Sequence, residues 1–106
     1  MPLSRDFRET VMEELSEPHY RRAFLREAIN ALLRGDLDTT KSALRIYING
    51  TVGFIQASES LGRSPKSLMR MLSPEGNPHA RNLLDLVAFL QSVEGISMQV
   101  VETIAT

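Results

Sequence analysis

The chain has 106 residues and a formal net charge of −1, and it contains no cysteine. This length fits one domain and leaves no room for a second core of ordinary size. Without cysteine, the chain can form neither a disulfide framework nor a thiolate metal site. No apolar run approaches the ~18 residues that a membrane span needs, and residues 1–10 lack the apolar centre of a signal peptide. We therefore expect a single domain, residues 1–106, in a cytoplasmic protein without a membrane partner.

The charged residues are unevenly distributed along the chain. Residues 1–60 carry eight lysines and arginines against nine acids, and residues 83–106 carry three acids and no base. Residues 61–82 instead contain four cationic residues against Glu75 alone, which is a local net charge of +3. A near-neutral total argues against a nucleic-acid binder of the generally basic kind. The cationic charge is concentrated in this one short segment.

Hydrophobic periodicity predicts three helices in residues 1–50. The first repeats apolar residues at i, i+4 and i+8 from Phe7. The second begins at Pro18, which suits a first helical turn, and ends at Gly35. Asp38 is expected to cap the third helix, which ends at Asn49-Gly50.

Three more helices are predicted in residues 51–94, and the first two of them are short. The first of them ends at Gly62, and Ser64 caps the next one. Asn77-Pro78 is expected to start the last, which runs to about residue 93. Within the C-terminal strand and tail, residues 95–106, the apolar residues Ile96, Met98 and Val100 alternate with polar ones, the pattern of a half-buried strand. The sequence therefore predicts an all-α domain of about six helices with a short C-terminal β-strand.

The two short helices around Gly62 have the geometry of a helix-turn-helix unit. In such a unit the second helix lies in the major groove and presents its N-terminal residues to base edges. Lys66, Ser67 and Arg70 fall on the side of that helix opposite its apolar residues. Cationic side chains in the turn and at the start of the last helix could bind flanking phosphates. A surface helix with solvated lysine and arginine is the alternative. The candidate DNA-binding residues are Arg63, Ser64, Lys66, Ser67, Arg70, His79 and Arg81.

The segment SLMRMLSPEGNPHARNLL, residues 67–84, resembles the signature of helix-turn-helix proteins known as probable addiction-module antidotes or prophage-type DNA-binding proteins. The resemblance extends upstream through RDFRETV, FLREAINALLRGD and RIYINGTVGF, so it covers nearly the whole chain. It implies a bacterial, lambda-repressor-like transcriptional regulator with residues 65–72 as its recognition helix. It also implies an antitoxin that represses its own promoter and binds a small ribonuclease-like toxin. Arg63 departs from the family pattern, which often has an apolar residue after the turn glycine.

The last predicted helix is apolar over more than half of its circumference, which is wider than a monomer's surface helix needs. Leu84 belongs to the stripe that we expect to face inward, and the second apolar stripe, which includes Leu86, is either wrapped by the first two helices or exposed as an interface. A lone strand also leaves its backbone groups unpaired and so favours pairing with another strand. We expect a homodimer on a palindromic operator. The candidate dimer or partner interface comprises Leu86, Phe89, Val93, Ile96, Met98 and Val100.

A second interpretation is a protein-interaction module that neutralises a partner toxin, with DNA binding secondary or absent. The first two helices carry a mixed-charge surface that could dock such a partner, although an ordinary solvated face explains the same pattern. This surface comprises Arg5, Arg8, Arg21, Arg22 and Arg26 with Glu9, Glu13, Glu14 and Glu17.

The sequence contains no pattern typical of catalysis. His19 and His79 lie far apart in the chain, and neither belongs to a recognisable catalytic or metal-binding motif. There is also no glycine-rich phosphate loop followed by Lys-Ser/Thr. We therefore expect no enzymatic activity, no cofactor and no metal.

Overall fold

The computed structural model describes residues 5–105, except for the side chains of residues 5, 6 and 8. Within this range the chain forms six helices and no strand, so the domain is all-α. The helices are α1 (Arg5–Glu14), α2 (Pro18–Leu33), α3 (Leu37–Gly50), α4 (Gly53–Leu61), α5 (Pro65–Met71) and α6 (Ala80–Glu94).

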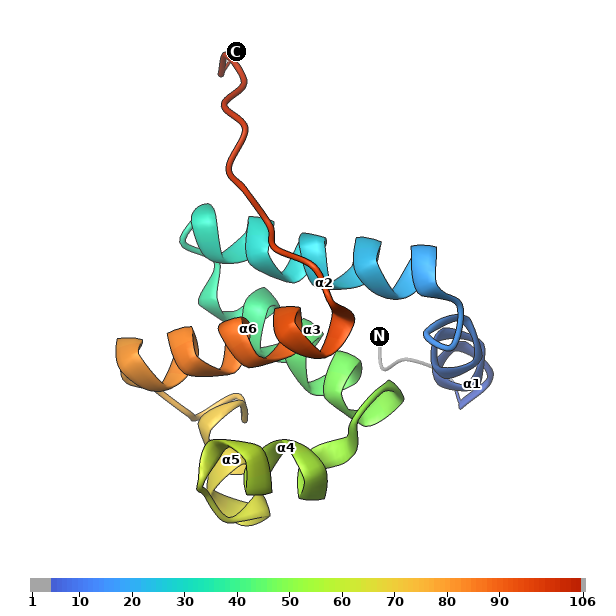
Figure 1. Cartoon of the computed structure of the whole chain (residues 1–106), viewed down its shortest axis with the longest axis vertical. Coiled ribbons are helices and arrows are strands. Elements are labelled where there is room, and N and C mark those ends of the chain that lie inside the picture. The colour runs from blue at the N-terminus through green and yellow to red at the C-terminus, as the bar shows by residue number, and fades with distance from the viewer. Residues whose placement is uncertain (1–4, 106) are drawn as a thin grey trace.

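The helices surround one apolar core to which five of them, and Leu15 just after α1, contribute buried side chains. In Figure 1, α2 lies at the top, α3 and α6 cross the middle, and α4 and α5 close the bottom. The segment after α6 leaves the molecule at the end opposite α4 and α5 (Figure 1). The two short helices therefore form one end of the domain.

The connection between α4 and α5 is a three-residue turn whose geometry follows from its sequence. Gly62 caps α4 in the left-handed region, with φ +67°, which glycine adopts without steric cost. The next amide, that of Arg63, donates to the carbonyl of Ser58 over 2.9 Å. The Ser64 hydroxyl then accepts from the Ser67 amide over 3.1 Å and caps α5. The predicted end of α4 and start of α5 are confirmed, and α5 ends at Met71, one residue before the predicted end.

Two helix starts differ from the sequence-based expectation. Asp36, not Asp38, caps α3, because its carboxylate accepts from the Thr39 amide over 3.1 Å. The helix therefore begins earlier, and Asp38 lies in its first turn. The Asn77-Pro78 pair lies in the loop before α6, whose N-cap is His79. The pair has no regular secondary structure, and the turn of this loop lies earlier, at residues 74–75.

The predicted C-terminal strand is absent from the structure, in which residues 96–105 have no regular secondary structure. Ile96 and Met98 are partly buried, and the Met98 amide donates to Gln91 Oε1 over 2.8 Å. Beyond them the chain is exposed, and Val100 is 76% accessible. The alternation correctly predicts that Ile96 and Met98 are partly buried. No strand forms, because residues 5–105 contain no other strand to pair with the segment.

The two apolar stripes of α6 also require a correction. Leu86 was a candidate interface residue, but it is fully buried in the core of this chain. Leu84 was expected to face inward, yet it is 58% exposed. The inward face of α6 consists of Leu83, Leu86, Val87, Leu90 and Glu94. Phe89 packs partly against the core, and Val93 is 44% exposed, so only the outer flank of α6 is accessible.

Candidate nucleic-acid interface

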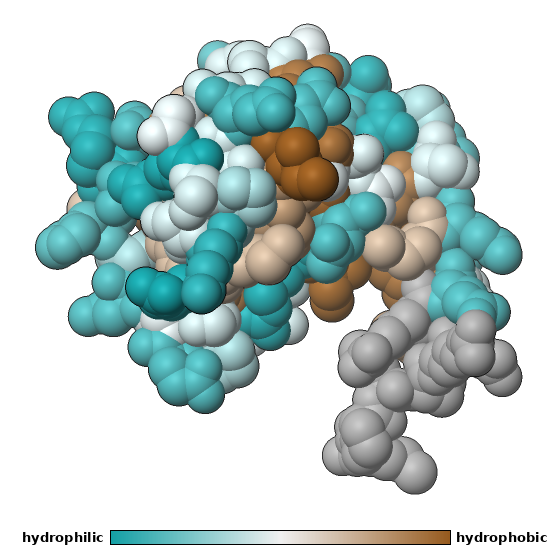
Figure 2. Space-filling model, turned by 90° about the horizontal axis from the view of Figure 1, so that it is seen from below, coloured by the Kyte–Doolittle hydropathy of each residue, from teal (hydrophilic) through white to brown (hydrophobic). Residues whose placement is uncertain are grey.

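The outer face of α5 is cationic and accessible. Lys66 and Arg70 are one helical turn apart and both are exposed, while Ser67 is partly exposed beside them. The opposite face is anchored in the core by Leu68 and Leu72, which are fully buried. Figure 2, which views the molecule from the end that α4 and α5 form in Figure 1, shows hydrophilic side chains over most of this face, with apolar ones between them. The helix thus has a buried apolar side and an open cationic side.

An open hollow of about 400 Å³ lies between α5 and the loop that leads to α6. It brings together four of the predicted site residues: Arg63, Ser67, Arg70 and His79. Its lining is otherwise mainly the loop itself and includes Met71, Ser73, Glu75, Gly76, Asn77, Pro78 and Asn82. Two arginines at one hollow form a surface that suits an anion such as phosphate.

The remaining candidates lie outside this lining. Lys66 is exposed on α5, and the Ser64 hydroxyl is used as the α5 cap. Arg81 is 82% exposed in the first turn of α6, with Nη1 at 3.8 Å from Asp85 Oδ1. His79, which does line the hollow, is exposed at the N-cap of α6, and its side chain makes no capping hydrogen bond within the described structure.

Two cations of α3 hold the end of α5 and the following loop in place. Lys41 is almost completely buried, and its Nζ donates to the carbonyl oxygens of Gly76 over 2.6 Å and Pro74 over 3.1 Å. The Arg45 guanidinium donates to the carbonyl oxygen of Leu72, at the C-terminus of α5. A cation there also interacts favourably with the helix dipole. These side chains fix the loop that forms one wall of the hollow.

Neither α3 cation is among the site residues predicted from the sequence. The available signal was the position of Lys41, which is three residues before Leu44 and seven before Ile48 on the inward face of α3. A lysine in an apolar stripe is expected to have a buried partner, because an unpaired ammonium is costly to bury. The hydrogen-bond acceptors of Lys41 are backbone carbonyls, which no residue pattern reveals, and the Asp38 carboxylate lies 3.8 Å from its Nζ.

Gly76 allows the loop to approach the end of α5 closely. A Cβ atom at this position would lie 2.4 Å from the carbonyl oxygen of Arg70 and 2.5 Å from that of Met71. Both distances are shorter than real Cβ contacts, and both atoms belong to the backbone, which cannot move aside cheaply. The glycine in SPEGNP is therefore required by a close approach rather than by a positive φ.

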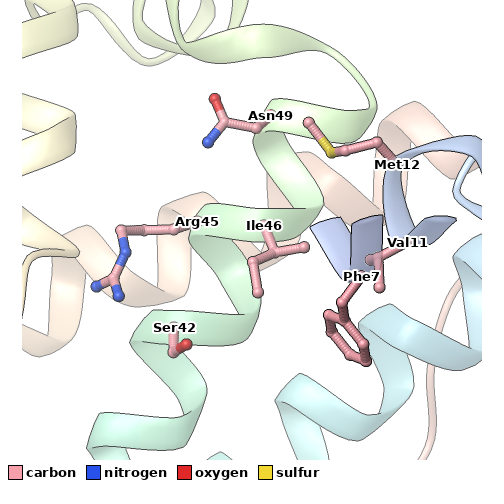
Figure 3. Close-up of a pocket in the computed structure, with 7 residues that line it drawn as sticks. All are labelled: Phe7, Val11, Met12, Ser42, Arg45, Ile46 and Asn49. Carbon is pink, nitrogen blue, oxygen red and sulfur yellow. The ribbon is translucent and has the colours of Figure 1, made fainter. Parts of the chain in front are cut away.

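A second open hollow, also of about 400 Å³, lies between α1 and α3 (Figure 3). Its apolar lining is Phe7, Val11, Met12 and Ile46, and Phe7 is 51% exposed. In Figure 3, Phe7 and Val11 project from α1 toward Ile46 of α3. The polar part of its lining is Ser42, Arg45 and Asn49. This hollow is a second candidate surface for binding a partner.

The mixed-charge surface is smaller than the sequence suggested, because two of its arginines turn toward a buried acid. Arg21 Nε donates to Glu94 Oε1 over 2.5 Å, and Arg22 Nε lies 3.8 Å from Glu94 Oε2. The Tyr47 hydroxyl also donates to Glu94. Burial, and then the hydrogen bond to this carboxylate, raise the pKa of Tyr47 above its usual value. The side chains of Arg5 and Arg8 lie outside the described part of the chain.

Among the described residues, no helix combines the length and apolar character needed to cross a bilayer. The same residues contain no group of three or more histidine, aspartate or glutamate side chains that could hold a metal ion. Comparisons of the chain with protein-family models, with curated proteins and with solved structures find no match.

Proposed function

We propose that the chain is a sequence-specific DNA-binding transcriptional regulator in which α4 and α5 act as a lambda-repressor-like helix-turn-helix unit. The observation that carries this proposal is the open cationic side of α5, with Lys66 and Arg70 exposed and the opposite side buried. A short helix of this kind can enter the major groove with its polar side toward the base edges. The three-residue turn at Gly62 is consistent with such a unit.

Contacts to the phosphate backbone would come from the hollow beside α5. Arg63 lines it, and its guanidinium group can bind two phosphate oxygens at once. His79, Arg81 and the free amides at the start of α6 would hold the flanking strand. In this scheme the phosphate contacts position the protein, while Lys66, Ser67 and Arg70 read the bases.

The proposed biological role is that of an antitoxin that acts in the cytoplasm, represses its own promoter and binds a small ribonuclease-like toxin. The resemblance of residues 67–84 to addiction-module antidotes supports this role. The protein would bind a palindromic operator as a homodimer, which places two copies of α5 about 34 Å apart along the duplex.

For the dimer contact we propose residues 96–102, joined by the exposed flank of α6 around Val93. These residues lack regular secondary structure in the single chain, and Val100 is exposed. Two such segments related by a two-fold axis could pair as antiparallel strands and satisfy each other's backbone groups.

A gel-shift titration with the DNA upstream of the protein's own gene tests the DNA-binding function. We expect a discrete complex for the wild-type protein and a large loss of affinity for the double variant Lys66→Ala/Arg70→Ala. Affinity should also fall steeply as salt rises, because phosphate contacts release counterions. Equal retention of the duplex by the wild type and the double variant would refute the proposed role of α5.

A protein-interaction module is the second candidate function, and the hollow between α1 and α3 favours it. Half-exposed apolar side chains such as Phe7 line this hollow, as expected of a surface that binds a partner. Co-expression with the neighbouring small gene, followed by co-purification, tests this function. Retention of the partner by the wild type and its loss on Ile46→Asp would support the module, whereas equal retention by both would exclude this hollow.

A further inference from the structure

The side chain of Met69 is the apolar exception on the open side of α5. The other apolar side chains of this helix and its C-cap, namely Leu68, Met71 and Leu72, are at most 8% exposed. Met69 is 48% exposed, so its thioether chain lies among the cationic residues of the same face. Core packing therefore does not account for an apolar residue here.

The position of Met69 on the helix is defined by the helical repeat. Successive residues are about 100° apart, so Lys66 and Arg70 form the outer ridge opposite Leu68. Ser67 and Met69 then flank this ridge on opposite sides. Ser67 lines the hollow beside α5, whereas Met69 does not. The outer side of α5 consequently has one polar flank and one apolar flank.

We propose that Met69 is a specificity-determining residue that contacts the C5 methyl group of a thymine in each half-site. This inference rests on the proposed DNA-binding function and names part of its target. Thymine alone among the four bases presents a methyl group in the major groove, and apolar side chains are its usual partners. A flexible methionine also adapts its shape to such a contact.

The test is to replace thymine with deoxyuridine, which removes only the methyl group. The full-length protein first selects its preferred duplex from a randomised pool, and each thymine of that duplex is then replaced in turn. For the wild type we expect one thymine per half-site at which the replacement weakens binding about fourfold, the effect of burying one methyl group.

Three variants test whether Met69 causes this effect. Met69→Ala should bind the thymine and deoxyuridine duplexes equally, while Met69→Leu should keep the discrimination. Lys66→Ala should bind both duplexes more weakly but keep the ratio between them. Because Met69 is half-exposed, its variants should unfold at the same urea concentration as the wild type, which serves as the folding control.

The possible failures separate this inference from the function on which it rests. If none of the single thymine replacements weakens binding of the wild type to its selected duplex, the Met69 inference is wrong and the DNA-binding function stands. The inference is also wrong if the Met69→Ala variant still binds the deoxyuridine duplex about fourfold more weakly than the thymine duplex. It is wrong as well if the selected duplex contains no thymine. If the protein enriches no duplex and binds none, both the function and the inference are refuted.

Discussion

Lys41 Nζ donates a hydrogen bond to the carbonyl oxygen of Gly76 over 2.6 Å and thereby joins α3 to the loop between α5 and α6. These residues are 35 positions apart in the chain. The same ammonium group binds the carbonyl oxygen of Pro74, so one buried cation satisfies two backbone groups of the loop. The loop forms a wall of the hollow that contains Arg63, Arg70 and His79. The geometry of the proposed DNA-binding surface therefore depends on a residue outside it.

Replacing this lysine should destabilise the fold. Lys41→Met keeps the length of the side chain but removes both hydrogen bonds, and a hydrogen bond to a charged group contributes about 1.5–3 kcal/mol. We expect the free energy of unfolding, measured by urea denaturation, to fall by about 3 kcal/mol, the lower end of the sum for two such bonds, because methionine also removes the cost of burying a charge. Lys66→Met is the matched control, because Lys66 is exposed and its loss should change stability by less than ~0.5 kcal/mol. Equal stability of the two variants would contradict the role of Lys41.

The close approach at Gly76 gives a second stability prediction. Gly76→Ala places a Cβ within 2.4 Å of the Arg70 carbonyl oxygen, so the loop must move away from α5. We expect a loss of ~1–3 kcal/mol in the free energy of unfolding, as for other substitutions that overfill a packed site. Glu75→Ala, at an exposed position of the same loop, should be nearly neutral. A Gly76→Ala protein as stable as the wild type would show that the contact is loose.

The buried contact between Tyr47 and Glu94 predicts a loss of stability in alkali. The folded-state pKa of Tyr47 is raised above its ordinary value of 10.0 by burial and by the hydrogen bond to the Glu94 carboxylate. Above pH 10 the unfolded chain therefore releases the phenolic proton while the folded chain keeps it. The stabilising contribution is complete below about pH 10 and decreases as the pH rises further.

Urea denaturation at pH 8, 9.5 and 11 measures this effect, with Tyr47→Phe as the comparison. The wild type should lose more stability than the variant between pH 9.5 and 11, because phenylalanine has no proton to release. Parallel losses in the two proteins would mean that other groups cause the alkaline transition.

The C-terminal segment predicts the oligomeric state. If residues 96–102 pair across a two-fold axis, the full-length chain should be a dimer at micromolar concentration by light scattering. Truncation after Gln99 should give a folded monomer, because Val100, Val101 and Ile104 are at least 76% exposed. A full-length monomer, or a dimer unchanged by the truncation, would contradict the proposed contact.

The sequence predicted the helices well because helix signals are local. Gly62 and Ser64 act within a few residues of their own positions, and the structure has the turn and the cap where these residues predict them. Leu86 shows the limit of this reasoning. The apolar side of α6 is broad, and a residue at its edge is buried or exposed according to the helices that pack there. Leu86 is buried and Leu84 is exposed, the reverse of the pattern-based assignment.

The long-range polar contacts of the site could not be predicted from patterns. Lys41 and Arg45 bind backbone carbonyls of a distant loop, and every residue has such a carbonyl. The prediction of a terminal strand is wrong for a related reason, since a strand exists only beside another strand. Alternation along Ile96, Met98 and Val100 describes a half-buried segment but supplies no partner for it.

The central claim is that α5 reads DNA sequence through Arg70, and the ratio of operator affinity to random-duplex affinity measures it most directly. We expect Arg70→Ala to reduce this ratio roughly tenfold, because a bidentate arginine–guanine contact is worth about 1–3 kcal/mol of discrimination. Arg26→Ala, at an exposed position of α2, should leave the ratio unchanged. An equal loss of affinity for both duplexes would make Arg70 a phosphate contact only, and it would contradict the claim that this residue reads the bases.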